Sequence, residues 1–187
     1  MITTIRKRLT ELTPARFPSN RPQASVLIAL TDHDDPEVIL TKRAATLSTH
    51  SGEIAFPGGK YDETDTDLLF TALREAHEEV GLLPSSVDVI GLVPKTVELV
   101  PNPGELDEVF SVPLSFFLAD QRYSTDEIRF KGKSLYVPAW EYQGHIIWGL
   151  TAYMLVELLN EGCGADIPMK PRPEYAVRRF LRESEEQ

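Results

Sequence analysis

Residues 59–82 read GKYDETDTDLLFTALREAHEEVGL, and apolar side chains recur through this stretch at the spacing of an α-helix. The recurring positions are Leu68, Leu69, Ala72, Leu73, Ala76 and Val80. Gly81 follows them, and glycine is the residue that most often ends a helix. The pattern predicts a helix over 66–80.

Three glutamates of this helix, Glu75, Glu78 and Glu79, stand at positions i, i+3 and i+4 and so project from one side. Like charges at this spacing weaken an isolated helix, so either solvent screens them or a cation gathers them. A solvated face is the usual explanation of a charge run. Mg²⁺ and Mn²⁺ prefer oxygen ligands and bind through few carboxylates while keeping waters and phosphate oxygens. We predict that the three glutamates hold one of these ions.

A turn rich in glycine, Phe56-Pro57-Gly58-Gly59, precedes the helix. Two adjacent glycines let backbone groups come close to a ligand. A Gly-Gly pair alone is weak evidence, but its combination with an Arg-Glu-x-x-Glu-Glu helix favours a metal site over a solvated face. We predict that Gly58 and Gly59 contact the substrate and that the Gly58 carbonyl is a further ligand of the metal.

The remaining chain predicts strands and helices in alternation, which is typical of an α/β fold. We expect strands at 24–30, 37–43, 87–93 and 95–100, a strand leading into a short helix at 109–119, and a hairpin of 123–130 with 134–140. Further helices are expected at 2–12, 146–162 and 173–183.

Composition limits the class of protein. The 187 residues, of which 42% are hydrophobic, fit one compact domain, and the formal net charge of −10 argues against a nucleic-acid binder that neutralises phosphates over a broad surface. Cys163 is the single cysteine, so no intrachain disulfide forms and a reducing cytoplasm is expected. No apolar run is long enough to span a membrane.

At residues 59–82 the chain resembles the Nudix hydrolase family, whose signature is a glycine, a spacer, Arg-Glu, an apolar residue, any residue, Glu-Glu, any residue, glycine and an apolar residue. The matching residues are Gly59, Arg74, Glu75, Ala76, Glu78, Glu79, Gly81 and Leu82. One position departs from the signature. Thr66 replaces the usual glutamate of the spacer, which is one residue longer here, so either neighbour, Asp65 or Asp67, can substitute for it.

A second stretch, LTKRAATLSTHSGEIAFPGG at 40–59, is similar to a motif of the coenzyme A pyrophosphatase branch of this family. Segments NPGELDEVFSVPL and WGLTAYML also resemble that branch, so the likeness extends from residue 24 to about 160. The chain is shorter than the branch at 90–100, which is expected to alter a sheet edge or a pocket wall if the protein itself is short there.

The resemblance implies a Nudix-type α/β/α sandwich around a mixed β-sheet, in one domain over 1–187 with a C-terminal tail from about 165. It implies metal-dependent hydrolysis of coenzyme A to 3′,5′-ADP and 4′-phosphopantetheine, and it is compatible with a homodimer. The composition favours the cytoplasm and argues against a nucleic-acid or membrane partner. Two alternatives stay open: a Nudix pyrophosphatase for ADP-ribose or dinucleotides, and a nucleotide-binding protein without turnover.

Site roles follow from the resemblance together with the chemistry of the side chains. Glu75 and Glu79 are expected to be the main ligands of the metal, with Glu78 as a further ligand, and Arg74 is expected to orient these carboxylates through charge-assisted hydrogen bonds. The general base is Glu78, a glutamate of the loop at 105–108, or the metal-activated water itself.

Of the two loop glutamates, Glu108 is preferred over Glu105 as the base. Arg43 and His50 are expected to bind the phosphates of coenzyme A, because arginine presents a planar fork of donors and a polar loop can close over the substrate. For His50, hydrogen bonding within the loop is an equally good explanation.

Overall fold

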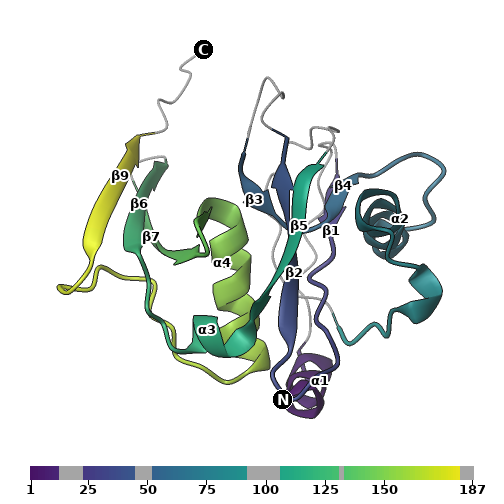
Figure 1. Cartoon of the computed structure of the whole chain (residues 1–187), viewed down its shortest axis with the longest axis horizontal. Helices are drawn as coiled ribbons and strands as arrows, with labels where there is room; N and C mark the ends of the chain where they lie inside the picture. Colours follow the sequence, from purple (N-terminus) through teal and green to yellow (C-terminus); the bar gives the residue numbers. More distant parts are fainter. Residues whose placement is uncertain (13–22, 45–51, 92–105, 131–132, 182–187) are drawn as a thin grey trace. The chain divides into compact units, whose positions relative to one another are not determined.

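The computed structural model describes residues 1–12, 23–44, 52–91, 106–130 and 133–181 (Figure 1). The chain divides into two compact units, residues 1–114 and 115–187, which are described separately here. His50, Glu105 and the expected strand at 95–100 lie outside the described residues.

The first unit opens with helix α1 (Ile2–Thr10), which buries Ile5 and Leu9. Its strands are β1 (Ala24–Val26), β2 (Glu37–Arg43), β3 (Ile54–Ala55), β4 (Gly58–Lys60) and β5 (Leu106–Pro113). β1 pairs antiparallel with β4, while β2 pairs antiparallel with both β3 and β5. The chain beyond β1 also reaches β2, because the backbone N–H of Ile39 donates to the Ala29 carbonyl. The glycine turn lies beside β1, because Gly58 and Gly59 belong to β4 and pair with Val26 and Ser25.

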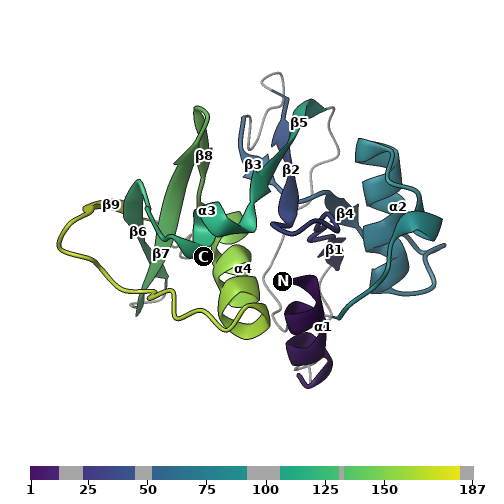
Figure 2. The ribbon, with the colours of Figure 1, turned by 60° about the horizontal axis from the view of Figure 1, so that its bottom comes forward.

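Helix α2 (Leu68–Val80) carries the glutamates and packs against β1 and β4 (Figure 2). It starts where the Asp67 side chain accepts a hydrogen bond from the Phe70 backbone N–H, which is a standard N-cap. It ends at Gly81, whose φ of 71° is the left-handed conformation that glycine adopts at low cost. Thr71, Ala72 and Ala76 are buried, and their small size lets the helix approach the strands closely. The short 3₁₀ helix η1 (Pro84–Ser86) follows.

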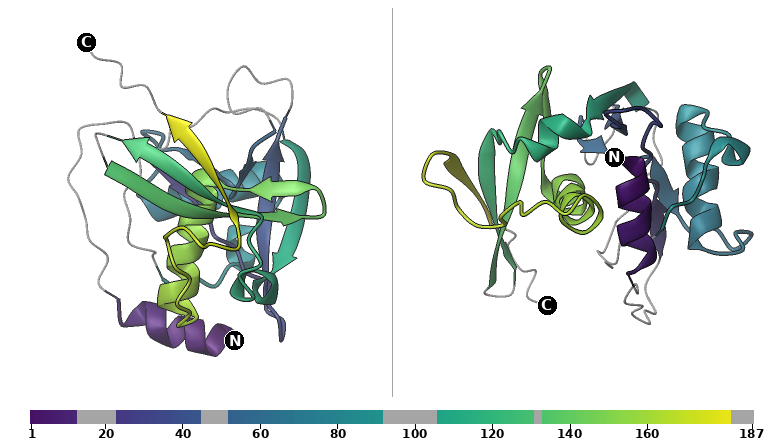
Figure 3. Two further views of the ribbon diagram at one scale, coloured as in Figure 1. Left: turned by 90° about the vertical axis from the view of Figure 1, so that its left-hand side faces the viewer. Right: turned by 90° about the horizontal axis from the view of Figure 1, so that it is seen from below.

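The second unit contains a four-stranded mixed sheet in the order β8-β7-β6-β9 (Figure 3). Its elements are α3 (Leu114–Leu118), β6 (Ser124–Phe130), β7 (Lys133–Tyr142), β8 (His145–Ile147), α4 (Gly149–Glu157), the π turn η2 (Leu158–Gly162) and β9 (Ala176–Leu181). β9 runs parallel to β6 and the other pairs are antiparallel. Helix α4 packs against β7, and Trp140 of β7 meets Phe117 edge to face at a centroid distance of 5.2 Å.

The predicted α/β class with a mixed sheet is confirmed, as are the strand at 37–43, the hairpin and the helix beneath the glutamates. Two predicted elements are wrong. Residues 173–183 do not form a helix, because 176–181 form β9, which hydrogen-bonds along β6 and pairs Arg178 and Arg179 with Asp126 and Glu127. Residues 87–91, expected in a strand, have no regular structure.

The prediction of one domain over 1–187 stays a prediction, since two compact units can belong to one domain. Within the described ranges, no helix combines the length and the apolar character needed to cross a bilayer.

Candidate active site

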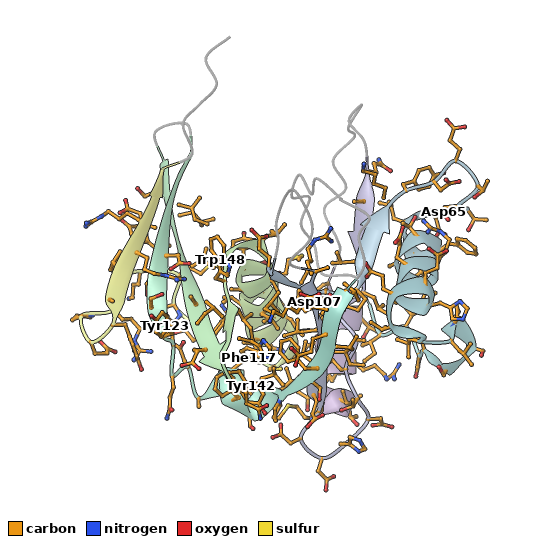
Figure 4. All side chains as sticks on the ribbon, turned by 45° about the horizontal axis from the view of Figure 1, so that its top comes forward. Asp65, Asp107, Phe117, Tyr123, Tyr142 and Trp148 are labelled. Carbon is orange, nitrogen blue, oxygen red and sulfur yellow. The ribbon has the colours of Figure 1, made fainter. Side chains whose placement is uncertain are left out.

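Asp65 and Arg74 form an ion pair joined by two hydrogen bonds. Arg74 Nε donates to Asp65 Oδ1 at 2.9 Å and Nη2 donates to Oδ2 at 3.0 Å, so the guanidinium makes a bidentate hydrogen-bonded pair with the carboxylate. The Asp65 side chain is fully buried and lies beside the start of α2 (Figure 4). The hydrogen bond from Arg74 holds the pKa of Asp65 well below its usual range, and the same bond raises the pKa of Arg74.

The structure gives different contacts to the two aspartates that the sequence left open as substitutes for the signature glutamate. Asp65 takes the arginine, whereas Asp67 caps the helix through the Phe70 N–H. The sequence does not separate the two aspartates, because each is adjacent to Thr66, which stands where the signature has its glutamate. Thr71, whose hydroxyl donates to Asp65 Oδ2 at 2.9 Å, was not anticipated as part of the site.

Arg74 also contacts two of the predicted metal ligands. Its Nη1 donates to Glu75 Oε1 at 2.9 Å and to Glu78 Oε2 at 3.3 Å, and its Nη2 donates to the Lys60 carbonyl of β4 at 3.1 Å. The Glu75 side chain is 18% exposed and that of Glu78 is 57% exposed. The arginine thus engages one oxygen of each of these two carboxylates, and its predicted role in orienting them for a metal stays a prediction.

Glu79 accepts a hydrogen bond from the glycine turn. Gly58 donates its backbone N–H to Glu79 Oε2 at 2.9 Å. Burial raises the pKa of the Glu79 carboxyl, the Gly58 hydrogen bond lowers it, and the negative charges of Glu75 and Glu78 raise it further. Burial and the neighbouring charges thus both disfavour the ionised form of Glu79, and a cation beside the carboxylates would favour it.

Both glycines of the turn lie where no side chain fits. A β-carbon on Gly59 would fall on the Glu75 carboxylate, and one on Gly58 would fall on the Ser25 carbonyl oxygen and the Val26 α-carbon. Gly59 therefore gives Glu75 the room to lie over β4, and Gly58 gives β1 the room to pair with β4. Both glycines contact the helix or its supporting strand, while their contact with a substrate stays a prediction.

Arg43 and Glu108 come from the neighbouring strands β2 and β5. Arg43 lies at the end of β2 and opposite Leu106, beyond a register shift in the β2–β5 ladder, and its positive charge lowers the pKa of Glu79. The structure thus brings Arg43 into the electrostatic range of the glutamate helix. Glu108 is exposed and lies opposite Lys42 in the same ladder, on a different element from the α2 glutamates. Its role as a base stays a prediction.

Three oxygen-donor side chains on one helix are chemically suited to Mg²⁺ or Mn²⁺. As they stand, two of them turn toward Arg74 and the third toward Gly58. Across the described ranges, no three His, Cys, Asp or Glu side chains converge closely enough to enclose a metal ion. The donor set suits such an ion by its chemistry, and binding of the ion here stays a prediction.

Comparison with known proteins gives the family. The NUDIX domain model matches residues 21–129. Nudix hydrolase 22, chloroplastic, of Arabidopsis thaliana is 38% identical over 195 residues, covering 88% of this chain and 64% of that protein. A protein of Photorhabdus laumondii named "Uncharacterized Nudix hydrolase NudL" is 36% identical over 166 residues, covering 79% of this chain and 89% of its own. A crystal structure of a NUDIX hydrolase from Alicyclobacillus acidocaldarius aligns with a TM-score of 0.38 at 20% identity, over 54% of this chain and 82% of that one.

The chain belongs to the Nudix family, because the family model covers more than half of it and the sequence relatives cover most of it. The family assignment supports the Nudix type of the α/β fold that the sequence predicts. The chain spans just under two thirds of the length of the Arabidopsis relative.

Proposed function

We propose that this Nudix protein is a divalent-metal-dependent pyrophosphohydrolase that cleaves coenzyme A to 3′,5′-ADP and 4′-phosphopantetheine. Support for hydrolysis of a nucleoside diphosphate derivative comes from the family and from the intact set of signature glutamates. Support for coenzyme A comes from the stretch 40–59. The observation that carries the proposal is a contact between this stretch and the signature helix: Gly58 donates its backbone N–H to Glu79 Oε2 at 2.9 Å.

The cation would be held by Glu75 and Glu79, with Glu78 as a further ligand. These are carboxylate donors, which Mg²⁺ and Mn²⁺ prefer. When bound, the cation supplies charge neutralisation for the diphosphate and activates water. Nudix hydrolases generally use such ions. Burial, followed by the charges of Glu75 and Glu78, raises the pKa of Glu79, and a cation beside this carboxylate would offset both effects.

In the reaction, a water oxygen attacks one phosphorus of the diphosphate. The bond between that phosphorus and the bridging oxygen breaks, and the bridging oxygen leaves with the second phosphate. The proton of the water passes to a carboxylate, and Glu78 and Glu108 are the candidates within the described residues because both side chains are exposed to solvent. Arg74 does not touch the diphosphate in this account. It holds the carboxylates of Glu75 and Glu78 in place.

Recognition of coenzyme A would use Arg43 and His50, with Gly58 and Gly59 admitting the diphosphate close to the backbone. The backbone around Arg43 is fixed on both sides, because the Arg43 N–H donates to the Glu53 carbonyl and the Gly52 N–H donates to the Arg43 carbonyl. A planar guanidinium on a fixed backbone is suited to a phosphate, which accepts two parallel hydrogen bonds.

The test is to incubate the purified protein with Mn²⁺ or Mg²⁺ and, in separate reactions, coenzyme A, ADP-ribose and a dinucleoside diphosphate, each with an EDTA control. Products are identified by mass. The proposal predicts EDTA-sensitive formation of 3′,5′-ADP and 4′-phosphopantetheine, with coenzyme A preferred by kcat/KM. Cleavage of ADP-ribose or the dinucleotide alone would reject the coenzyme A assignment, and cleavage of none would favour a nucleotide-binding protein without turnover.

A further inference from the structure

An arginine of the second unit lies against two aromatic rings. Tyr123 immediately precedes β6 and Trp148 is the N-cap of α4 (both are labelled in Figure 4), while Arg178 belongs to β9. The guanidinium carbon of Arg178 is 5.6 Å from the Tyr123 ring centroid and 6.0 Å from the Trp148 ring centroid. Both distances are within the range of a cation–π contact. Three separate elements thus bring together one arginine–aromatic cluster, which consists of Tyr123, Trp148 and Arg178.

The guanidinium of this cluster is fixed along one edge. Arg178 Nε donates to Asp126 Oδ1 at 2.8 Å, and Nη2 donates to Oδ2 at 2.9 Å. The Asp126 side chain is fully buried in β6, and its Oδ1 also accepts a hydrogen bond from the Ser124 hydroxyl at 3.2 Å. These bonds hold the plane of the guanidinium in one orientation. The Arg178 side chain is 33% exposed, so part of this fixed, flat group reaches solvent.

The Tyr123 ring is exposed although the backbone around it is fixed. The Tyr123 N–H donates to the Ala139 carbonyl at 2.7 Å. Its neighbours in sequence, Arg122 and Ser124, are buried, whereas Tyr123 itself is 54% exposed. Trp148 is partly exposed as well. A ring that a rigid backbone keeps in solvent contributes only part of its apolar area to the core, so packing alone does not account for its position.

The chemistry of the cluster favours a flat ligand group without charge. The positive charge of Arg178 disfavours a cation between the rings. A carboxylate or a phosphate would compete with Asp126 for the donors Nε and Nη2. Nucleic-acid bases, by contrast, stack on aromatic rings and on guanidinium planes without using these donors. A purine has two fused rings, so it covers more of a surface made of two aromatic rings and a guanidinium than a pyrimidine does.

We propose that Tyr123, Trp148 and Arg178 form a stacking site for the purine base of a nucleotide. The site lies within the second unit, and the inference depends neither on the proposed metal nor on cleavage of coenzyme A. Removal of one stacking ring weakens the binding of a base roughly 10- to 100-fold.

A purely structural role is the competing explanation, because the rings also cover the ion pair between Arg178 and Asp126. The two explanations differ in what they predict for folded Tyr123→Ala. A structural role lowers the melting temperature and leaves the nucleotide affinity of the folded molecules unchanged. A stacking role lowers that affinity at temperatures where the variant is fully folded, which circular dichroism at the assay temperature verifies.

The experiment titrates the protein with AMP in the presence of EDTA and follows tryptophan fluorescence. Trp140 and Trp148 are the two tryptophans of the chain, and Trp140 is fully buried, so quenching by a stacked base reports on Trp148. We expect AMP to quench the fluorescence and Tyr123→Ala to raise the dissociation constant roughly 10- to 100-fold. Tyr123→Phe keeps the ring and should bind AMP nearly as the unmodified protein does.

Leu135→Ala is the matched control variant. Leu135 is a 43% exposed apolar side chain on β7 of the same sheet, and its removal should leave the AMP affinity unchanged. Ribose 5-phosphate and CMP are the control ligands. The first has the sugar and the phosphate of AMP without a base and should not quench the fluorescence, and the second should bind more weakly than AMP.

Equal AMP affinity of folded Tyr123→Ala and the unmodified protein would overturn the inference, as would the absence of quenching or an equal response to ribose 5-phosphate. Tighter binding of CMP would overturn the choice of a purine. Glu79→Gln separates the inference from the proposed function: AMP should bind this variant unchanged, and a loss of binding would place the base at the glutamate helix instead. If AMP binds through Tyr123 but the unmodified protein does not cleave coenzyme A, the inference stands and the proposed function fails.

Discussion

The carboxylate of Glu75 occupies the space that a β-carbon on Gly59 would fill. The signature glycine is therefore required by a side chain of the signature helix, 16 residues later in the sequence, and not by its own backbone conformation. The neighbouring Gly58 differs, because a β-carbon there would meet backbone atoms of Ser25 and Val26. Substitution of Gly59 and of Gly58 should consequently have different effects on the protein.

Gly59→Ala should fold normally, because the end of the flexible Glu75 side chain can move aside, but it should lose turnover roughly 10- to 100-fold as Glu75 leaves its place. Gly58→Ala should instead lower the melting temperature, because backbone atoms of β1 cannot move without breaking the pairing with β4. Activity assays and thermal unfolding of the two variants separate these effects. Equal activity of Gly59→Ala and the unmodified protein would contradict this account of Glu75.

Arg43→Lys keeps the positive charge near Glu79 and removes the planar fork of donors. If Arg43 binds the 3′-phosphate, KM for coenzyme A should rise about tenfold, while KM for dephospho-coenzyme A, which lacks that phosphate, should change little. Steady-state kinetics on the two substrates measure the difference. A parallel rise in both values would place Arg43 at the diphosphate instead, and no rise would remove it from the site.

The stability of the protein should depend on Asp65 at acid pH. The folded-state pKa of Asp65 lies below its ordinary value of 3.8, because the carboxylate accepts hydrogen bonds from Arg74. A depressed pKa stabilises the folded state at pH values above the ordinary one, and this stabilisation is lost as the pH falls from there toward the folded-state value. The difference in unfolding free energy between the unmodified protein and Asp65→Asn should thus reach its largest value above about pH 5 and decrease below pH 4. Urea unfolding across this range measures it, and a difference that stays constant would contradict the pKa shift.

The second unit offers a test of stability away from the candidate site. Arg122 is fully buried and bonds to Asp120, the Thr125 hydroxyl and the Pro168 carbonyl. Arg122→Met should cost about 3 kcal/mol of unfolding free energy, since it leaves a buried carboxylate with less of its compensation. Arg6→Met, which breaks the exposed pair with Asp88, is the control and should cost less than about 1 kcal/mol. A similar loss of unfolding free energy in Arg122→Met and Arg6→Met, measured by urea unfolding, would contradict the stabilising role of buried Arg122.

The signature helix was predictable because its information is local: apolar spacing, a helix-ending glycine and carboxylates one turn apart all lie within residues 66–81. β9 was not predictable in the same way. Arg178 and Arg179 occur in a segment with good helix formers, but the segment pairs along the distant strand β6, where the two arginines form ion pairs with Asp126 and Glu127. The partner of Arg74 needed the structure for the same reason, since Asp65 and Asp67 are equivalent in sequence until the turn places one in the core and the other at the cap.

The most direct test of the central claim compares the unmodified protein with Glu79→Gln in the formation of 3′,5′-ADP from coenzyme A at saturating Mn²⁺, with both proteins shown to be folded. Glutamine keeps an oxygen that can accept the Gly58 hydrogen bond but removes the charge that a cation needs. The account predicts rapid, EDTA-sensitive product formation by the unmodified protein and a loss of roughly 100-fold or more in the variant. Equal rates in the two proteins, or product formation that persists in EDTA, would contradict catalysis by a metal held on the glutamate helix.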